Sequence, residues 1–151
     1  MNPAMHQVES GRSIAAVANF FETLVPESVG QLDRLYAGDA HFKDPHNDVV
    51  GVAEIEKIFR HMFASLTAPR FVVTNKISEG NQCFLSWEFH FYFRGFKRNV
   101  EQVVRGASHL VFDDEGLITQ HRDYWDAAEE LYEKLPVIGT LMRWLKRQAK
   151  P

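Results

Sequence analysis

The residues best suited to chemistry are His121 and Asp123, which lie two positions apart in a predicted strand, residues 117–125. Alternation places both on one face, about 7 Å apart at ~3.3 Å per residue. Burial shifts the pKa of ionisable groups, so an inward-facing pair would act as acid and base or would orient a ligand. Two alternatives stay open: the face with Arg122 and Tyr124 points inward, or His121 only bonds to the backbone.

Asp44 is a further candidate base. It follows Phe42 in a short predicted strand, residues 40–43, and precedes Pro45. The alternative is an ordinary turn stabilised by the Asp44 carboxylate. The sequence has no Ser/His/Asp triad, phosphate loop or metal-ligand spacing. We therefore expect no metal and no cofactor.

The elements that must position these residues are helices first and strands afterwards. Apolar residues at helical spacing predict three helices, the first after an N-cap at Ser13 and the third ended by Pro69: residues 14–24, 28–36 and 52–66. Period-two alternation predicts four antiparallel strands: residues 71–77, 82–94, 102–112 and 117–125. A helical stretch from Ala127, interrupted at Pro136 and Gly139, follows. This order indicates an α+β domain.

The strand at residues 82–94 predicts a large apolar interior. Its apolar face carries four aromatic side chains, whereas Glu88 and His90 lie on the opposite, solvated face. Aromatic residues make up 13% of the chain, which suits a pocket for a small hydrophobic molecule. The predicted lining is almost wholly apolar: Phe20, Phe42, Phe59, Met62, Trp87, Phe89, Phe91, Ser108, Leu110 and Trp125.

Composition excludes several classes of protein. The 151 residues suit one domain, and no apolar run is long enough to span a bilayer. The single Cys83 cannot form an internal disulfide and is expected in the core, so we expect a cytoplasmic protein. The formal net charge of −3 gives no case for nucleic-acid binding.

The tail at residues 136–151 forms a separate basic segment. Its apolar positions share one stripe and its basic positions lie apart from them: Val137, Ile138, Leu141, Met142 and Leu145, against Arg143, Lys146, Arg147 and Lys150. Such a helix makes weak contact with an anionic membrane surface, or else packs on the domain or on a dimer partner. Both interpretations stay open.

Three features together resemble a known superfamily. They are the order of elements, the segment from Phe42 to Pro45 six residues before Gly51, and the ending from His121 to Asp126. The chain resembles the SnoaL-like polyketide cyclase group of the nuclear transport factor two-like superfamily, which includes ketosteroid isomerase and limonene epoxide hydrolase. The resemblance covers about residues 13–135. It implies a cone-shaped barrel of curved, mainly antiparallel sheet wrapped by three N-terminal helices, often a homodimer through the sheet face.

The resemblance also implies roles for particular residues. Asp44 matches the general base of the isomerase, and His121 with Asp123 matches the Arg-x-Asp pair of the hydrolase, with His in place of Arg. Phe20 and Ser108 stand where the isomerase has its oxyanion-hole donors, so steroid isomerase activity is not expected. The implied chemistry is proton transfer on a carbonyl or epoxide substrate, as in an isomerase, cyclase or hydrolase. The alternative is a non-catalytic ligand-binding or interaction module of the same fold.

Overall fold

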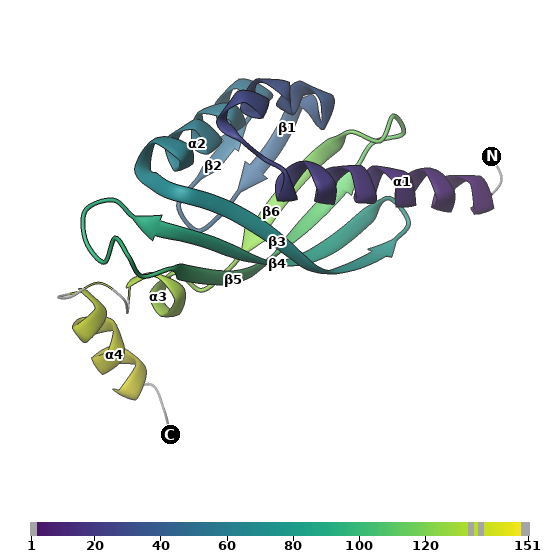
Figure 1. The fold of residues 1–151 in the computed structure, drawn as a ribbon. Helices are drawn as coiled ribbons and strands as arrows, with labels where there is room; N and C mark the ends of the chain where they lie inside the picture. Colours follow the sequence, from purple (N-terminus) through teal and green to yellow (C-terminus); the bar gives the residue numbers. More distant parts are fainter. Residues whose placement is uncertain (1–2, 133–134, 136–137, 149–151) are drawn as a thin grey trace.

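The computed structural model describes residues 3–132, 135 and 138–148. One six-stranded sheet forms its centre, in the order β2-β1-β6-β5-β4-β3 (Figure 1). The strands are β1 (Tyr36–Lys43), β2 (Asp48–Val50), β3 (Leu66–Glu79), β4 (Gln82–Phe93), β5 (Gln102–Phe112) and β6 (Ile118–Tyr124). Three helices precede or interrupt them: α1 (Pro3–Glu22), the 3₁₀ helix η1 (Pro26–Arg34) and α2 (Val52–Ser65).

The sheet is mainly antiparallel. Among the strands of the described residues, only β1 and β6 pair in parallel, with Phe42 opposite His121. The sheet curves without closing, because β2 and β3 remain as unpaired edges. Apolar side chains of α1, η1 and α2 pack on its inner face and form one core with β4, β5 and β6. The predicted α+β class with a curved sheet and three N-terminal helices is confirmed.

Helix α1 begins at Pro3, so the predicted N-cap at Ser13 is wrong. Proline suits the first turn of a helix because its missing N–H is not needed there, and Ala4 and Gln7 are good helix formers. Ser13 lies within the helix. A Cβ on Gly116 would meet its Oγ at 2.7 Å, and Gly116 has a positive φ of +81°. The turn between β5 and β6 therefore requires glycine beside α1.

Pro69 does not end the third predicted helix. Helix α2 ends at Ser65 and β3 starts at Leu66, well before the predicted residue 71. Pro69 is accommodated because β3 is an edge strand and its pairing with β4 shifts register between Thr67 and Arg70. A missing N–H is tolerated at an edge and in a bulge.

The C-terminal helices are α3 (Ala127–Glu130) and α4 (Ile138–Gln148). The Asp126 carboxylate caps α3 by accepting hydrogen bonds from two backbone N–H groups, both at 3.0 Å. The predicted break at Pro136 lies outside the described residues. The predicted break at Gly139 is wrong, because Gly139 lies inside α4. In the described part of the chain, no helix is long and apolar enough to cross a membrane.

Candidate functional site

A cavity of about 290 Å³ lies between the inner face of the sheet and the helices. Most of its wall is aromatic or aliphatic. The polar lining residues are Asp44, His46, Ser108, His121 and Asp123. Among the described residues, no lysine or arginine belongs to this lining. An apolar cavity with a few convergent polar groups is the usual form of a small-molecule site.

Most of the residues predicted to line a pocket line this cavity. Nine of them line the cavity: Phe42, Phe59, Met62, Trp87, Phe89, Phe91, Ser108, Leu110 and Trp125. Phe20 is not among the lining residues, and its neighbour Phe21 lines the wall instead. Phe20 packs against the core from a partly buried position. The candidate residues Asp44, His121 and Asp123 also line the cavity.

His121 and Asp123 point inward from β6. His121 is 4% exposed, and its Nε2 lies 2.7 Å from Oδ1 of Asp123. The His121 ring also lies against Phe42, with the ring centroids 4.7 Å apart. Alternation along β6 keeps Arg122 and Tyr124 on the exposed outer face. The alternative in which that face points inward is therefore wrong.

Ser108 joins the same carboxylate from the next strand. It lies directly opposite Asp123 in the β5–β6 pairing, and its Oγ donates to Asp123 Oδ1 at 2.5 Å. Trp87 Nε1 donates to the Ser108 Oγ at 2.9 Å. The indole takes this position because Gly106 lies opposite Trp87, where a Cβ would be only 2.5 Å from the ring. Gly106 therefore makes room for the indole that orients Ser108.

Tyr36 completes the chain of hydrogen bonds on the other side of the imidazole. Its hydroxyl lies 2.6 Å from His121 Nδ1. Burial, with a smaller effect from the charge of Asp123, raises the pKa of Tyr36 well above its ordinary value, so the phenol keeps its proton. We assign the Tyr36 hydroxyl as donor to Nδ1 and Nε2–H as donor to Asp123, because each group then has a partner of the right kind.

The two carboxylate oxygens of Asp123 differ in their surroundings. Oδ1 accepts hydrogen bonds from His121 and Ser108. Oδ2 accepts no hydrogen bond from the described residues. It is not buried, because no buried side-chain nitrogen or oxygen in the described residues lacks a partner. It is therefore an accessible acceptor on a residue that lines the cavity. The Asp123 side chain as a whole is 18% exposed.

Asp44 lies near the cavity but serves a turn. Its Oδ1 accepts hydrogen bonds from the backbone N–H groups of His46 and Asn47, at 2.7 and 2.6 Å. The Asn47 amide donates to both carboxylate oxygens, at 3.1 and 3.0 Å. The Asp44 carboxylate thus stabilises a turn, which was the alternative to its interpretation as a general base. Its carboxylate has less free acceptor capacity than that of Asp123.

Tyr36 is the site residue that sequence reasoning missed. Apolar residues at helical spacing before Tyr36 predicted that it ends a helix. In the structure Tyr36 begins β1, and its side chain is 1% exposed. One signal was available: a buried tyrosine hydroxyl needs a hydrogen-bond partner, and His121 was a candidate. Within the described residues, no group of three or more His, Cys, Asp or Glu side chains is arranged to hold a metal ion.

Comparison with models of protein families identifies the family of this chain. The family model of the SnoaL-like domain matches residues 17–121, which is more than half of the chain. The chain belongs to the SnoaL-like family. No functionally curated protein matches it by sequence.

Solved structures share the SnoaL-like architecture at low sequence identity. An LEH-like epoxide hydrolase of M. tuberculosis is 16% identical, with a TM-score of 0.65 and coverage of 92% of this chain and 97% of that one. A candidate SnoaL-like polyketide cyclase from Jannaschia sp. CCS1 is 12% identical, with a TM-score of 0.69 and coverage of 85% and 92%.

A third neighbour comes from Catenulispora acidiphila DSM 44928. It has a ketosteroid isomerase-like fold and was solved in complex with trimethylamine. It is 20% identical, with a TM-score of 0.65 and coverage of 79% of this chain and 88% of that one. At these identities the likeness establishes the fold that this SnoaL-like chain shares, and chemistry must be argued from its own residues.

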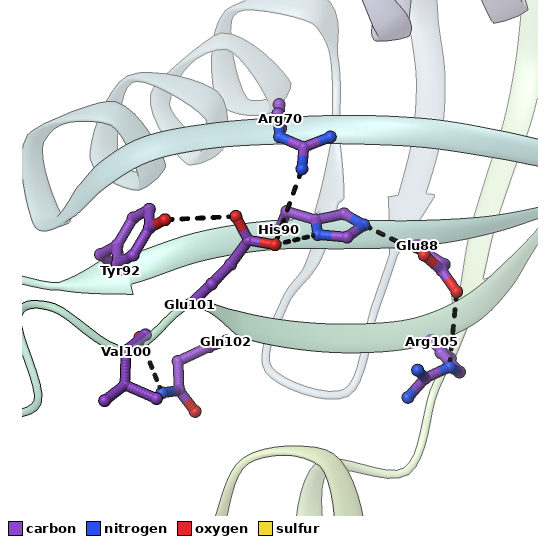
Figure 2. A network of polar contacts seen from close by, with 8 residues as sticks. All are labelled: Arg70, Glu88, His90, Tyr92, Val100, Glu101, Gln102 and Arg105. Carbon is purple, nitrogen blue, oxygen red and sulfur yellow. Dashed lines mark hydrogen bonds and ion pairs between the residues drawn. The ribbon is translucent and has the colours of Figure 1, made fainter.

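A second polar cluster lies on the outer face of the SnoaL-like sheet (Figure 2). His90 lies between two carboxylates, with Nδ1 2.7 Å from Glu101 and Nε2 3.0 Å from Glu88. Arg70 and Arg105 flank these carboxylates at 3.6 and 3.5 Å. The hydrogen bond from His90 is the main cause that lowers the pKa of Glu101. The predicted solvated face is thus largely ion-paired, and the His90 side chain is only 13% exposed.

Proposed function

We propose that this SnoaL-like protein binds a small, mostly apolar molecule in its cavity and that Asp123 transfers a proton on that molecule. The observation that carries the proposal is the asymmetry of the Asp123 carboxylate. His121 and Ser108 fix Oδ1, whereas Oδ2 of this cavity-lining residue stays accessible and accepts no hydrogen bond from the described residues. A fixed carboxylate with one free oxygen in an apolar site has the geometry of a general base.

The substrate class that fits is a hydrophobic carbonyl compound or epoxide. On a carbonyl compound, Oδ2 of Asp123 takes a proton from the neighbouring carbon, and the electron pair moves into the carbonyl as an enolate. On an epoxide, Oδ2 takes a proton from water while the water oxygen attacks a ring carbon. The ring C–O bond breaks, and the released oxygen takes the proton back from Asp123 to give a diol. The description of one structural neighbour as an epoxide hydrolase, and of another as a candidate cyclase, supports these two classes.

His121 is the positioning residue for Asp123. Its ring is held by the Tyr36 hydroxyl at Nδ1, so Nε2–H stays directed at Asp123. A fixed tautomer of this kind maintains one orientation of the carboxylate. Asp44 is the weaker candidate, because its turn already occupies its acceptors.

A non-catalytic binding protein is the second candidate, and one observation favours it. An enolate needs hydrogen-bond donors for its oxygen. Ser108 already donates to Asp123, and Phe20, the other position matched to an isomerase donor, lies outside the lining. The same cavity would then hold its ligand without turnover.

Isotope labelling separates the two candidates without knowledge of the product. The protein is incubated with aryl ketones in D₂O and with aryl epoxides in H₂¹⁸O, and mass spectrometry follows label in the small molecule. Catalysis predicts label that depends on the protein and falls at least ~10²-fold in Asp123→Asn. Quenching of tryptophan fluorescence measures binding in parallel, because Trp87 and Trp125 both line the cavity. Binding without label supports the second candidate, and neither binding nor label on either panel ends both.

Two further expectations accompany this proposal. We propose a homodimer through the outer face of the sheet, where Ile77 and Phe84 pair across β3 and β4 and are 70% and 45% exposed. Large exposed apolar side chains on one face mark an interaction surface.

The cytoplasmic location expected from the single cysteine stays a prediction.

A further inference from the structure

Helix α4 carries an apolar face that the rest of the described protein leaves uncovered. Ile138, Leu141 and Leu145 fall on one side at helical spacing, and they are 47%, 52% and 45% exposed. Trp144 lies beside them and is 50% exposed. Apolar side chains on a helix of a folded domain are normally buried against it. The described residues therefore leave this apolar face without a packing partner.

The charge of α4 indicates the kind of occupant. Its sequence contains Arg143, Lys146 and Arg147 and no acidic residue, although the whole chain has a formal net charge of −3. The spacing of Arg143 and Arg147 places them on the side of the helix opposite Leu141 and Leu145. Tryptophan at the boundary between the two faces is typical of helices that lie in a membrane interface.

Helix α4 lies at the periphery of the described part of the protein (Figure 1). It contacts α3 and lies at the end of the molecule far from the start of α1 (Figure 1). Leu131, which directly follows α3, lines the cavity. A surface that received α4 would thus lie close to one wall of the cavity.

We propose that α4 is a docking helix for an anionic lipid bilayer. Its apolar side chains enter the boundary between headgroups and acyl chains, while its basic side chains contact anionic headgroups. A zwitterionic surface supplies only the first of these interactions. Binding therefore depends on anionic lipid and weakens as salt screens the charges. This inference is independent of the chemistry proposed for Asp123.

Vesicle flotation of the full chain tests the proposal. The vesicles are phosphatidylcholine alone or phosphatidylcholine with phosphatidylglycerol in equal parts. Binding to the anionic vesicles is expected to be about tenfold stronger or more, and to fall with added salt. Equal binding to both vesicles, or none to either, overturns the proposal.

A pair of double variants locates the contact. Leu141→Glu with Leu145→Glu is expected to abolish flotation. Val25→Glu with Val50→Glu is the matched control, since these side chains are 47% and 61% exposed outside α4, and it is expected to float as the wild type does. Circular dichroism verifies that both variants fold. Flotation that survives the α4 variant contradicts the proposal. Light scattering without vesicles gives a second test. If the protein is a dimer that only the α4 variant dissociates, the proposal is also contradicted, because a second copy of the chain would then cover the apolar face of α4.

Discussion

His121 and Asp123 stand side by side on β6, with the imidazole Nε2 2.7 Å from the carboxylate Oδ1. This contact is one link in a chain of five side chains that starts at Tyr36 and ends at Trp87. Each link comes from a residue fixed by strand pairing or by burial. The chain holds one oxygen of Asp123 and leaves the other without a hydrogen-bond partner among the described residues.

Replacing Ser108 with alanine tests the link between Trp87 and Asp123. The substitution removes a donor from Asp123 and leaves the indole N–H of Trp87 without an acceptor. Leaving a buried donor without a partner costs about 1–3 kcal/mol, so the free energy of unfolding is expected to fall by that amount. Urea denaturation measures it. In a Trp87→Phe background the same change is expected to cost less, and equal costs in both backgrounds would refute the link.

Replacing Gly106 with alanine tests the position of the indole. The new Cβ would lie 2.5 Å from the Trp87 ring, which must move into the cavity or distort β5. Overpacking of this kind costs about 1–3 kcal/mol. Gly38→Ala is the control, because a Cβ there meets no atom within 4 Å. We expect a lower melting temperature and an altered near-ultraviolet spectrum for Gly106→Ala alone. Matching results for the two variants would argue against this packing.

Cys83 is expected to be unreactive in the folded protein. It is 1% exposed, and burial raises the pKa of its thiol to about 11. The raised pKa favours the neutral thiol in the folded state, so the contribution of Cys83 to stability is full below pH 9 and is lost as the pH rises toward 11. A thiol reagent at pH 8 is expected to react only after denaturant is added. Rapid labelling of the native protein would contradict the placement.

Replacing Phe84 with glutamate tests the proposed dimer. The change puts a charge on the outer face of the sheet, where Phe84 stacks on His109 at 4.4 Å between ring centroids. A charge buried in an interface without a partner is strongly unfavourable, so a dimer is expected to dissociate. Light scattering at several concentrations measures the mass, with Val50→Glu as control. A monomeric wild type would remove the basis of the proposal.

Much of the fold was predictable because it depends on local periodicity. The strand predicted at residues 102–112 has those bounds in the structure. Tyr36 was placed in a helix because its neighbours have helical spacing, but parallel pairing of β1 with β6 recruits it into the sheet. Such a long-range pairing leaves no local signal. The same holds for Pro69, whose edge position depends on the strand order.

The sequence was enough to name candidate residues of the site, whereas the hydrogen bonds between them could not be predicted. Two-residue spacing on a strand was enough to name His121 and Asp123 as a pair. The partnership of Ser108 with Asp123 depends on the register of β5 and β6, which shifts between Val111 and Phe112. That shift also places Ile118 on the buried side, against strict alternation. Side-chain networks of this kind follow from tertiary packing and cannot be read from one strand.

The most direct test of the account compares Asp123→Asn with Asp44→Asn in the isotope-labelling assay. Both changes remove one negative charge from the cavity lining, and both keep the size of the side chain. The account predicts that Asp123→Asn lowers label incorporation at least ~10²-fold with little change in ligand affinity, because a general base is lost. It predicts a much smaller loss for Asp44→Asn. Normal incorporation by Asp123→Asn, or a loss confined to Asp44→Asn, would contradict it.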